Sequence, residues 1–321
     1  MTESNKLKHI IMVLISAAAV LAVCFAAAAF VEATDVTYHE NEKEAAAELR
    51  DAMKQRKTKV TIGITGEPDE KKLKKSIGRL IRKAMEHTGE PDEGDYITYQ
   101  FASYKGQAHT TYSGYTPVYE IEYDLEYYDD ADQEAEVDKK ADEILAELDL
   151  ADKDDYEKIR AIHDYLCDNV EYESVEKGGN TRYTAYGALI EGKAVCQGYS
   201  VSLYRLLLEA GINNRIIFGT GNSMFTEGGP HTWNIVKFDE AYYYMDVTWD
   251  DVTGSHDYFL IPEGEGFEEE HIAGDKFNKD SFTEKYPVSD EKIEIHFKWM
   301  PDIMEHFITV VRNFFTGKNR G

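Results

Sequence analysis

Hydrophobic and polar residues follow a different pattern in each part of this chain. Residues 10–31 are almost continuously apolar, whereas residues 36–128 and 150–262 contain stretches with a helical period and stretches with a strand period. Because helical faces repeat every 3.6 residues and strand faces every two, these patterns predict an α+β protein. The remaining residues, 263–321, form a C-terminal extension, and its segment 301–315 predicts a short amphipathic helix that cannot cross a bilayer.

The apolar stretch 10–31 is long enough to cross a bilayer as a helix. Lys6 and Lys8 precede it and Glu32 follows it. Positive charge before an apolar segment favours a cytoplasmic N-terminus, so we expect residues 1–9 inside the cell and the body of the protein outside. The stretch is therefore predicted to be a transmembrane signal anchor that holds a single-pass protein in the cell membrane.

Processing of this stretch remains open from the sequence alone. The alanines at 26–29 would suit a signal peptidase, and cleavage there would give a secreted protein. Residues 21–24 faintly resemble a lipoprotein motif, but Val23 is a poor fit before Cys24 and the apolar run continues beyond it.

Residues 36–128 are predicted to form a separate small α+β domain. The expected elements are helices at 40–55 and 69–88, a strand at 57–64, and two tyrosine-rich strands near 95–105 and 115–128. Tyrosines at every second position are typical of a half-buried sheet, and no catalytic motif occurs in this part. An acidic helix is predicted next, at 132–148.

Two apolar helices are predicted within residues 150–262. Cys167 lies on the apolar face of the first, which is formed by Ile159, Ile162, Leu166 and Val170. A cysteine on such a face usually belongs to the core, and we assign Cys167 to it. The second helix is predicted at 196–210, and Gly211 is a natural stop for it.

Composition excludes several classes of function. The formal net charge of −26 argues against nucleic-acid binding, because phosphate contacts require clustered Lys and Arg. The three cysteines include one in the apolar N-terminal stretch and cannot form a disulfide framework. The acidic stretches 129–136 and 246–251 lack the spacing of a calcium loop. We therefore expect no essential metal and no other cofactor.

Cys196 is the strongest candidate for a catalytic residue, because it begins the second apolar helix. The N–H groups and the dipole at a helix N-terminus favour an anion, so a thiol there has a lowered pKa and more of the reactive thiolate. The same N–H groups can stabilise the oxyanion of a tetrahedral intermediate. Gly198 is expected to keep side-chain bulk away from the sulfur.

A base and an orienting acid for this thiol are predicted on a β-hairpin formed by residues 231–238 and 241–249, both rich in β-branched and aromatic residues. A two-residue turn between these strands places His231 opposite Thr248. Asp246 then shares the face of His231 as its diagonal neighbour, within side-chain reach. A turn that is one residue longer or shorter would send Asp246 to the opposite face.

Three motifs carry a resemblance to a known family. They are Tyr-Thr-Ala-Tyr-Gly-Ala-Leu-Ile-Glu-Gly-Lys-Ala-Val-Cys-Gln-Gly-Tyr-Ser at 183–200, His-Thr-Trp-Asn at 231–234 and Asp-Val-Thr-Trp-Asp at 246–250. With them, residues 150–262 resemble the bacterial transglutaminase-like superfamily. The resemblance implies a papain-like core, in which a helix bearing the cysteine packs on an antiparallel sheet bearing the histidine and the aspartate.

The resemblance also implies a role for each matching residue. Cys196 matches the nucleophile of the family, His231 its base, and Asp246 the residue that orients the base. Tyr199 and Trp233 match aromatic positions beside the site, and we expect them to support it without taking part in the chemistry.

The expected activity is acyl transfer on peptide or side-chain amides, by a cysteine protease or amidase that uses water or by an enzyme that cross-links amines. The sequence leaves this choice open, as it does whether the peptide or protein substrate is associated with the cell wall. The alternative is a non-catalytic binding or scaffold module at the cell surface. It remains open because an upstream side chain often completes the oxyanion site in this family, and the sequence does not show whether Tyr186 or another residue does so.

Overall fold

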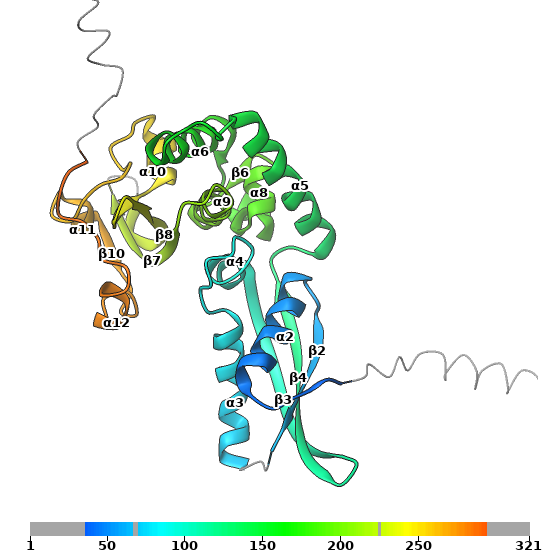
Figure 1. Ribbon diagram of the computed structural model, residues 1–321. Helices are drawn as coiled ribbons and strands as arrows, with labels where there is room; N and C mark the ends of the chain where they lie inside the picture. Colours follow the sequence, from blue (N-terminus) through cyan, green and yellow to red (C-terminus); the bar gives the residue numbers. More distant parts are fainter. Residues whose placement is uncertain (1–35, 67–69, 224–225, 294–321) are drawn as a thin grey trace, which may run out of the picture.

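A computed structural model describes residues 36–66, 70–223 and 226–293 (Figure 1). The predicted anchor at 10–31 and the predicted helix at 301–315 lie outside the described residues. Within the described residues, none of the helices has the length and apolar character needed to cross a membrane.

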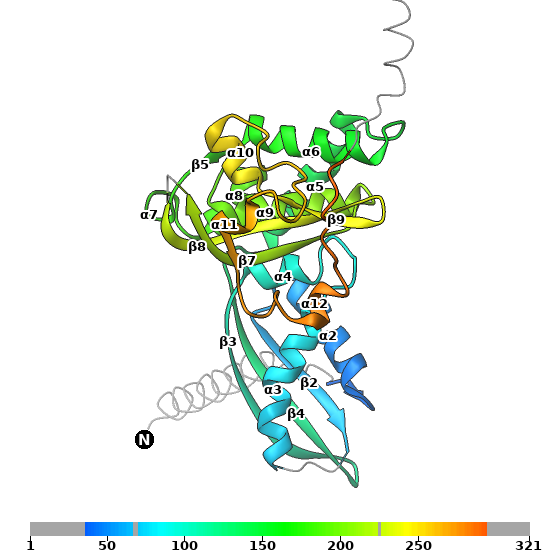
Figure 2. The ribbon, with the colours of Figure 1, turned by 90° about the vertical axis from the view of Figure 1, so that its left-hand side faces the viewer.

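The N-terminal unit, residues 36–127, is a four-stranded sheet with two helices packed on it (Figures 1 and 2). Its sheet order is β1-β2-β4-β3, with strands β1 (Tyr38–His39), β2 (Lys59–Thr65), β3 (Phe101–Ser113) and β4 (Thr116–Tyr127). The predicted helices at 40–55 and 69–88 are confirmed as α2 (Glu42–Lys54) and α3 (Glu70–Ala84). In β4, Ile121, Tyr123 and Leu125 are buried and the residues between them are exposed, as in a half-buried strand.

The stretch near 95–105 was predicted to be a strand, and this is wrong for its first half. It begins as helix α4 (Asp95–Gln100) and continues as β3. Tyr96 and Tyr99 of α4 are buried in the core of the second unit. The two tyrosines are three residues apart, a spacing that places both on one face of a helix, and their burial in the second unit outweighs the strand propensity of tyrosine.

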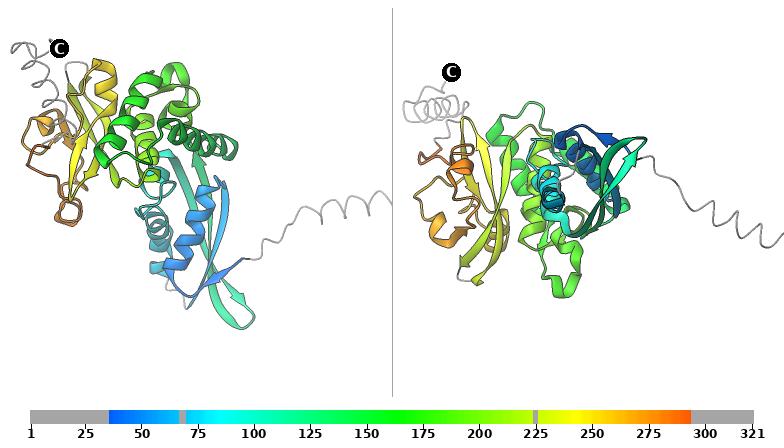
Figure 3. Two further views of the ribbon diagram at one scale, coloured as in Figure 1. Left: turned by 45° about the horizontal axis from the view of Figure 1, so that its top comes forward. Right: turned by 90° about the horizontal axis from the view of Figure 1, so that it is seen from below.

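The second unit, residues 131–293, is an antiparallel sheet with helices on one face and an irregular C-terminal segment on the other (Figure 3). Its sheet order is β10-β7-β8-β9, with strands β7 (Asn214–Ser223), β8 (Thr226–Phe238), β9 (Ala241–Met245) and β10 (His271–Ala273). Helix α9 (Cys196–Glu209) packs on β7 and β8, surrounded by α5 (Ala131–Leu148), α6 (Asp155–Asn169) and α8 (Ala185–Leu189). Phe267, Phe277 and Tyr286 of the C-terminal segment cover the other face.

The shorter elements connect these parts. Between α6 and α9 lie β5 (Glu171–Tyr172), α7 (Val175–Gly178), the 3-10 helix η1 (Asn180–Tyr183) and β6 (Lys193–Ala194). After the sheet strand β9 come α10 (Val247–Thr253), α11 (Phe267–Glu270) and α12 (Asp280–Thr283).

Helix α9 is the centre of the second unit. The predicted stop is confirmed at Gly211, whose φ of 84° is the left-handed conformation that glycine adopts readily. The sequence predicted one apolar face, but every residue from Gly198 to Leu208 is buried, Ser202 and Arg205 included. Sheet and helices therefore enclose α9 on all sides, which holds its first residue, Cys196, in a fixed place.

The predicted hairpin has the expected register but a shorter second strand. Phe238 pairs with Ala241 across the two-residue turn, and the last pair is Asn234 with Met245. The predicted strand at 241–249 is wrong beyond Met245, because the next residue caps helix α10 instead of continuing the ladder. The predicted pairing of His231 with Thr248 therefore does not form.

Candidate active site

Cys196 is the first residue of α9, as predicted. Val195 before it has extended backbone angles (φ −93°, ψ 175°), and its N–H donates to the carbonyl of Arg182 at 3.0 Å. Gly198 was expected to keep side-chain bulk away from the sulfur, but the structure indicates a different role. A Cβ at this position would lie 2.7 Å from the carbonyl oxygen of Arg182 and 2.7 Å from the Cβ of Ala194. Gly198 thus allows η1 and β6 to pack directly on the helix that carries the cysteine.

The thiol of Cys196 is partly buried and interacts with the imidazole of His231. Burial alone would raise the pKa of the thiol. Hydrogen bonding to His231, the charge of that ring and a backbone hydrogen bond from Thr232 together outweigh burial and lower the pKa. The site therefore favours a thiolate beside a protonated imidazole.

His231 is oriented by Asp246. Its Nε2 donates to Asp246 Oδ2 at 2.6 Å, which leaves Nδ1 as the ring nitrogen available to the thiol. Burial alone would lower the pKa of His231, but the charge of Asp246 and the hydrogen bond to it, followed by the interactions with Cys196, raise the pKa to about 10. The three predicted residues are thus brought together in the order Cys196, His231, Asp246.

Asp246 is buried and accepts four hydrogen bonds. Its Oδ1 caps α10 by accepting the N–H groups of Thr248 at 3.0 Å and Trp249 at 3.2 Å, while Oδ2 faces the active site. Burial would raise the pKa of the carboxyl group, but the charge of His231 and the hydrogen bonds to the site lower it overall. Asp246 therefore reaches His231 as a helix cap, and not as the cross-strand neighbour that the hairpin predicted.

A second histidine, His271 on β10, donates from Nε2 to the same Asp246 Oδ2 at 2.9 Å. It is 3 % exposed and its Nδ1 lies 3.1 Å from the carbonyl oxygen of Phe267. Both ring nitrogens of His271 therefore face oxygen atoms. The sequence analysis missed His271, because it lies far from the three motifs along the chain and no local pattern marks it.

Aromatic rings hold the imidazole of His231. Trp249 stacks on it with ring centroids 5.0 Å apart and planes at 20°, and Trp233 lies 6.0 Å away at 30°. Trp233 was predicted beside the site and lies there, whereas Trp249 was not predicted. Tyr199, the other predicted aromatic residue, is fully buried, and its hydroxyl lies 2.6 Å from Asp251 Oδ2. It holds α9 against α10.

Tyr172 on β5 is an upstream side chain whose hydroxyl is a candidate hydrogen-bond donor to the oxyanion. Tyr172 pairs with Ala194, two residues before Cys196, and its pKa is raised by partial burial and then by the negative charge of Cys196. The side chain is 46 % exposed, so it lies at the mouth of the site. Tyr186, the residue considered from the sequence, packs against the core instead.

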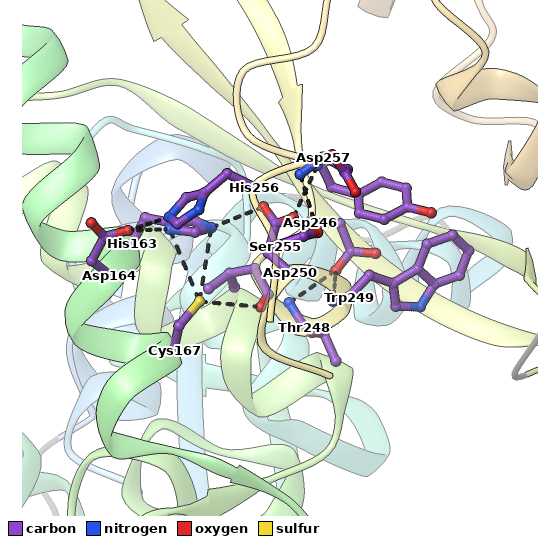
Figure 4. A network of polar contacts seen from close by, with 12 residues as sticks. His163, Asp164, Cys167, Asp246, Thr248, Trp249, Asp250, Ser255, His256 and Asp257 are labelled. Carbon is purple, nitrogen blue, oxygen red and sulfur yellow. Dashed lines mark hydrogen bonds and ion pairs between the residues drawn. The ribbon is translucent and has the colours of Figure 1, made fainter. Parts of the chain in front are cut away.

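A second Cys-His-Asp grouping lies between α6 and α10 and consists of Cys167, His163 and Asp250 (Figure 4). Cys167 Sγ lies 4.0 Å from Nδ1 and 3.9 Å from Nε2 of His163. Both nitrogens are already directed at carboxylates, namely Asp164 at 3.0 Å and Asp250 at 3.0 Å. No ring nitrogen is free to take the thiol proton, and burial raises the pKa of Cys167. Cys167 therefore packs against the core, as predicted.

Two groups of described side chains have donor atoms close enough to hold a metal ion. One is His231, Asp246 and His271; the other is His163, Asp164 and His256. In the first group the hydrogen bonds of the candidate triad already use the donor atoms. The second group is separate from Cys196.

Comparison with known proteins concerns the domain that carries these residues. Residues 142–247 match the family model of the transglutaminase-like superfamily. Among solved structures, the chain is similar to a TGase (12% identity, 67% of this chain and 59% of that chain, TM-score 0.33) and to the periplasmic domain of TgpA from Pseudomonas aeruginosa (14% identity, 49% and 69%, TM-score 0.30). The chain thus spans about three fifths of the length of the TGase. The search of curated proteins gave no match.

Proposed function

Because residues 142–247 form a domain of the transglutaminase-like superfamily, we propose that the protein is a cysteine-nucleophile enzyme that transfers the acyl group of peptide or side-chain amides. The observation that carries this proposal is the contact chain from the Cys196 thiol through His231 to Asp246. Nucleophile, base and orienting group are the three parts that acyl transfer by a thiol requires.

The reaction follows from the positions of these groups. The thiolate of Cys196 attacks the amide carbon and forms a carbon–sulfur bond, while the charge moves to the carbonyl oxygen. Protonated His231 gives its proton to the leaving nitrogen, and the carbon–nitrogen bond breaks to leave a thioester and a free amine. His231 then takes a proton from the incoming acceptor, which attacks the thioester; the carbon–sulfur bond breaks and Cys196 leaves as the thiolate, which restores the pair with protonated His231.

The oxyanion of each tetrahedral intermediate needs hydrogen-bond donors. The first N–H groups of α9 have no partner within a helix and point to the end where Cys196 lies. We assign the Tyr172 hydroxyl as a further donor, because β5 pairs Tyr172 with Ala194, two residues before Cys196. Donors fixed before the reaction stabilise the developing charge more effectively than bulk water.

We propose water as the acceptor. Cys196 is partly buried and Tyr172, on the strand that pairs with the segment before it, is 46 % exposed, which supports access of solvent to this end of α9. Cross-linking requires an amine to compete with water at the same position. We therefore propose hydrolysis as the main reaction, which makes the protein a peptidase or amidase.

Product analysis tests this proposal. A peptide library with glutamine and asparagine side chains is incubated with the purified chain, with and without an excess of a primary amine, and analysed by mass spectrometry. Hydrolysed products that are lost in Cys196→Ala support the proposal. Amine adducts in place of hydrolysis would show a cross-linking enzyme. Peptide binding without any product, equal in Cys196→Ala, would show the binding or scaffold module.

We also propose that the body of the protein lies outside the cytoplasm, held by residues 10–31 as a signal anchor and acting on a peptide or protein substrate there. Support comes from the charges that flank this apolar stretch. Fusing a reporter enzyme after residue 35 tests this orientation. A reporter that works only outside the cytoplasm should be active in this fusion. Activity confined to a cytoplasmic reporter would reverse the proposed orientation.

A further inference from the structure

His163, Asp164 and His256 form a cluster that the proposed reaction does not use; we call it the α6 cluster (Figure 4). His163 and Asp164 come from helix α6, and His256 follows α10 in the chain. We propose that the α6 cluster binds one divalent transition-metal ion of the Zn²⁺ type. This goes beyond the proposed function, and it departs from the sequence analysis, which found no metal-ligand spacing.

The donor atoms of the cluster converge on one point. Asp164 Oδ1 lies 3.0 Å from His163 Nδ1 and 2.8 Å from His256 Nε2. The one N–H of Arg160 Nε is shared between the two carboxylate oxygens and lies closer to Oδ2, at 2.7 Å, than to Oδ1, at 2.9 Å. The two imidazole nitrogens are therefore the main partners of Oδ1. A metal ion would replace the protons of both imidazoles, and the two rings would then face the ion as ligands.

The distances between these atoms fit a metal after a small expansion. Ligands at about 2.0–2.1 Å from a tetrahedral zinc ion lie roughly 3.3 Å from one another. The two measured edges of the α6 cluster are 3.0 and 2.8 Å, and all three donor atoms lie within 4.8 Å of one another. The two edges through Asp164 Oδ1 therefore need to lengthen by only a few tenths of an ångström to match a zinc site.

The groups behind the ligands are arranged as in metal sites. A metal-binding histidine usually donates its other ring N–H to a carboxylate. His163 does so, from Nε2 to Asp250 Oδ2 at 3.0 Å, and its side chain is completely buried. The carboxylate of Asp250 is itself fixed, because its Oδ1 accepts the N–H of Tyr258 at 3.0 Å. Asp164 is held on its outer side by Arg160 Nε, 2.7 Å from Oδ2.

The cluster is also open to solvent on one side. The side chains of His256 and Asp164 are 42% and 38% exposed, so an ion can enter and a water molecule can take the fourth position. Two imidazoles and one carboxylate suit Zn²⁺, Co²⁺ or Ni²⁺, whereas Ca²⁺ and Mg²⁺ prefer oxygen ligands alone. Cys167 is not assigned as a ligand, since its sulfur is equally distant from both nitrogens of His163 and so lies beside the ring.

A bound ion would join α6 to the segment after α10. Asp250 on α10 lies one turn after Asp246, the residue that orients His231. The ion would thus fasten the helix that Asp246 caps, and it would take no part in the acyl transfer. Because the imidazole ligands must lose their protons, binding releases protons to solvent and weakens in acid.

Metal titration tests the proposal on the purified full-length chain with Cys196→Ser, which removes the reactive thiol as a competing ligand. After treatment with a chelator, the chain is titrated with Zn²⁺ against a chromophoric competitor, and separately with Co²⁺. We expect one ion per chain, a higher melting temperature with Zn²⁺, and visible Co²⁺ bands without a thiolate charge-transfer band. His256→Ala should weaken Zn²⁺ binding about 100-fold or more.

Control variants separate this site from others. His109→Ala, which removes an exposed imidazole beside Glu120 on the N-terminal unit, should leave the affinity for Zn²⁺ unchanged, as should His271→Phe. His256→Gln repeats the test if His256→Ala does not fold. Absence of Zn²⁺ binding, equal affinity in the His256 variants, a thiolate band with Co²⁺, or loss of binding in His271→Phe would each overturn the proposal.

Discussion

His231 and His271 donate to one and the same oxygen, Asp246 Oδ2, at 2.6 and 2.9 Å. The negative charge of Asp246 is therefore shared between the ring that faces the thiol and a ring that faces away from it. Nδ1 of His271 also lies 3.1 Å from the carbonyl oxygen of Phe267, and its ring stacks on that of Phe267 at 3.8 Å, so it is held in place by contacts of its own. We regard His271 as a positioning residue that limits how strongly Asp246 acts on His231.

His271→Phe should move the alkaline limb of the activity profile to higher pH, by up to about one unit. The variant keeps an aromatic ring but removes one donor, so Asp246 Oδ2 acts on His231 alone and holds its proton more firmly. Hydrolysis rates measured against pH test this. If His271 only fills space, the rate falls equally at every pH and the limb stays where it was.

Tyr172→Phe should lower kcat by about 100- to 1000-fold, as expected for the loss of one oxyanion donor. The rate at which an alkylating reagent modifies Cys196 should stay the same, because alkylation forms no oxyanion. Tyr186→Phe is the matched control, since Tyr186 packs against the core. Equal effects of the two variants on kcat would show that Tyr172 is not an oxyanion donor.

Gly219→Ala should displace β10 and reduce activity. A Cβ at Gly219 would lie 2.1 Å from the carbonyl oxygen of Ile272, next to His271 on that strand. We expect a loss of about 2 kcal/mol or more in the free energy of unfolding, typical of overpacking. Gly229→Ala on β8 meets no atom within 4 Å and should be nearly neutral. Urea unfolding measures the free energy of unfolding of both variants, and equal values would contradict the predicted clash at Gly219.

His87 should make the protein less stable in mild acid. Its Nδ1 lies 2.8 Å from the hydroxyl of Tyr204 on α9, and burial, followed by the charge of Arg215, lowers its pKa to about 4. An unfolded histidine has a pKa of about 6.5, so the unfolded chain binds more protons between these values. Stability is therefore full above about pH 6.5 and falls as the pH decreases towards 4.

His87→Gln should reduce this loss of stability by about 1–2 kcal/mol. This is less than the whole pKa difference would give, because part of the ring is open to solvent. Urea unfolding at about pH 7 and about pH 4.5 measures the effect. His109→Gln, which changes an exposed ring, serves as the control. If the protein and its His87→Gln variant lose the same stability between these two pH values, His87 is not the source of the acid sensitivity.

Local sequence predicted the elements whose stability comes from nearby residues. The apolar run after Cys196 and Gly211 at its end predicted α9 with the cysteine at its start, and the two-residue turn predicted the register of β8 and β9. These features depend on helix period, capping and turn length, which are properties of neighbouring residues.

Other features depend on partners that are distant in the chain. Tyr96 and Tyr99 lie in a helix whose face the second unit buries, although tyrosine itself favours strands. His271 enters the site only because β10 pairs with β7, and Tyr172 only because β5 lies beside β6. Such contacts leave no periodic signal in the sequence, so only the fold reveals them.

The most direct test of the account is the alkylation rate of Cys196 as a function of pH, in a chain whose other cysteines, Cys24 and Cys167, are replaced by serine. Asp246 and His231 should keep the sulfur a reactive thiolate far below pH 8.5, the ordinary pKa of a cysteine, and His231→Ala should abolish this low-pH reactivity. A rate that follows an ordinary thiol and is the same in His231→Ala would contradict the proposed activated pair.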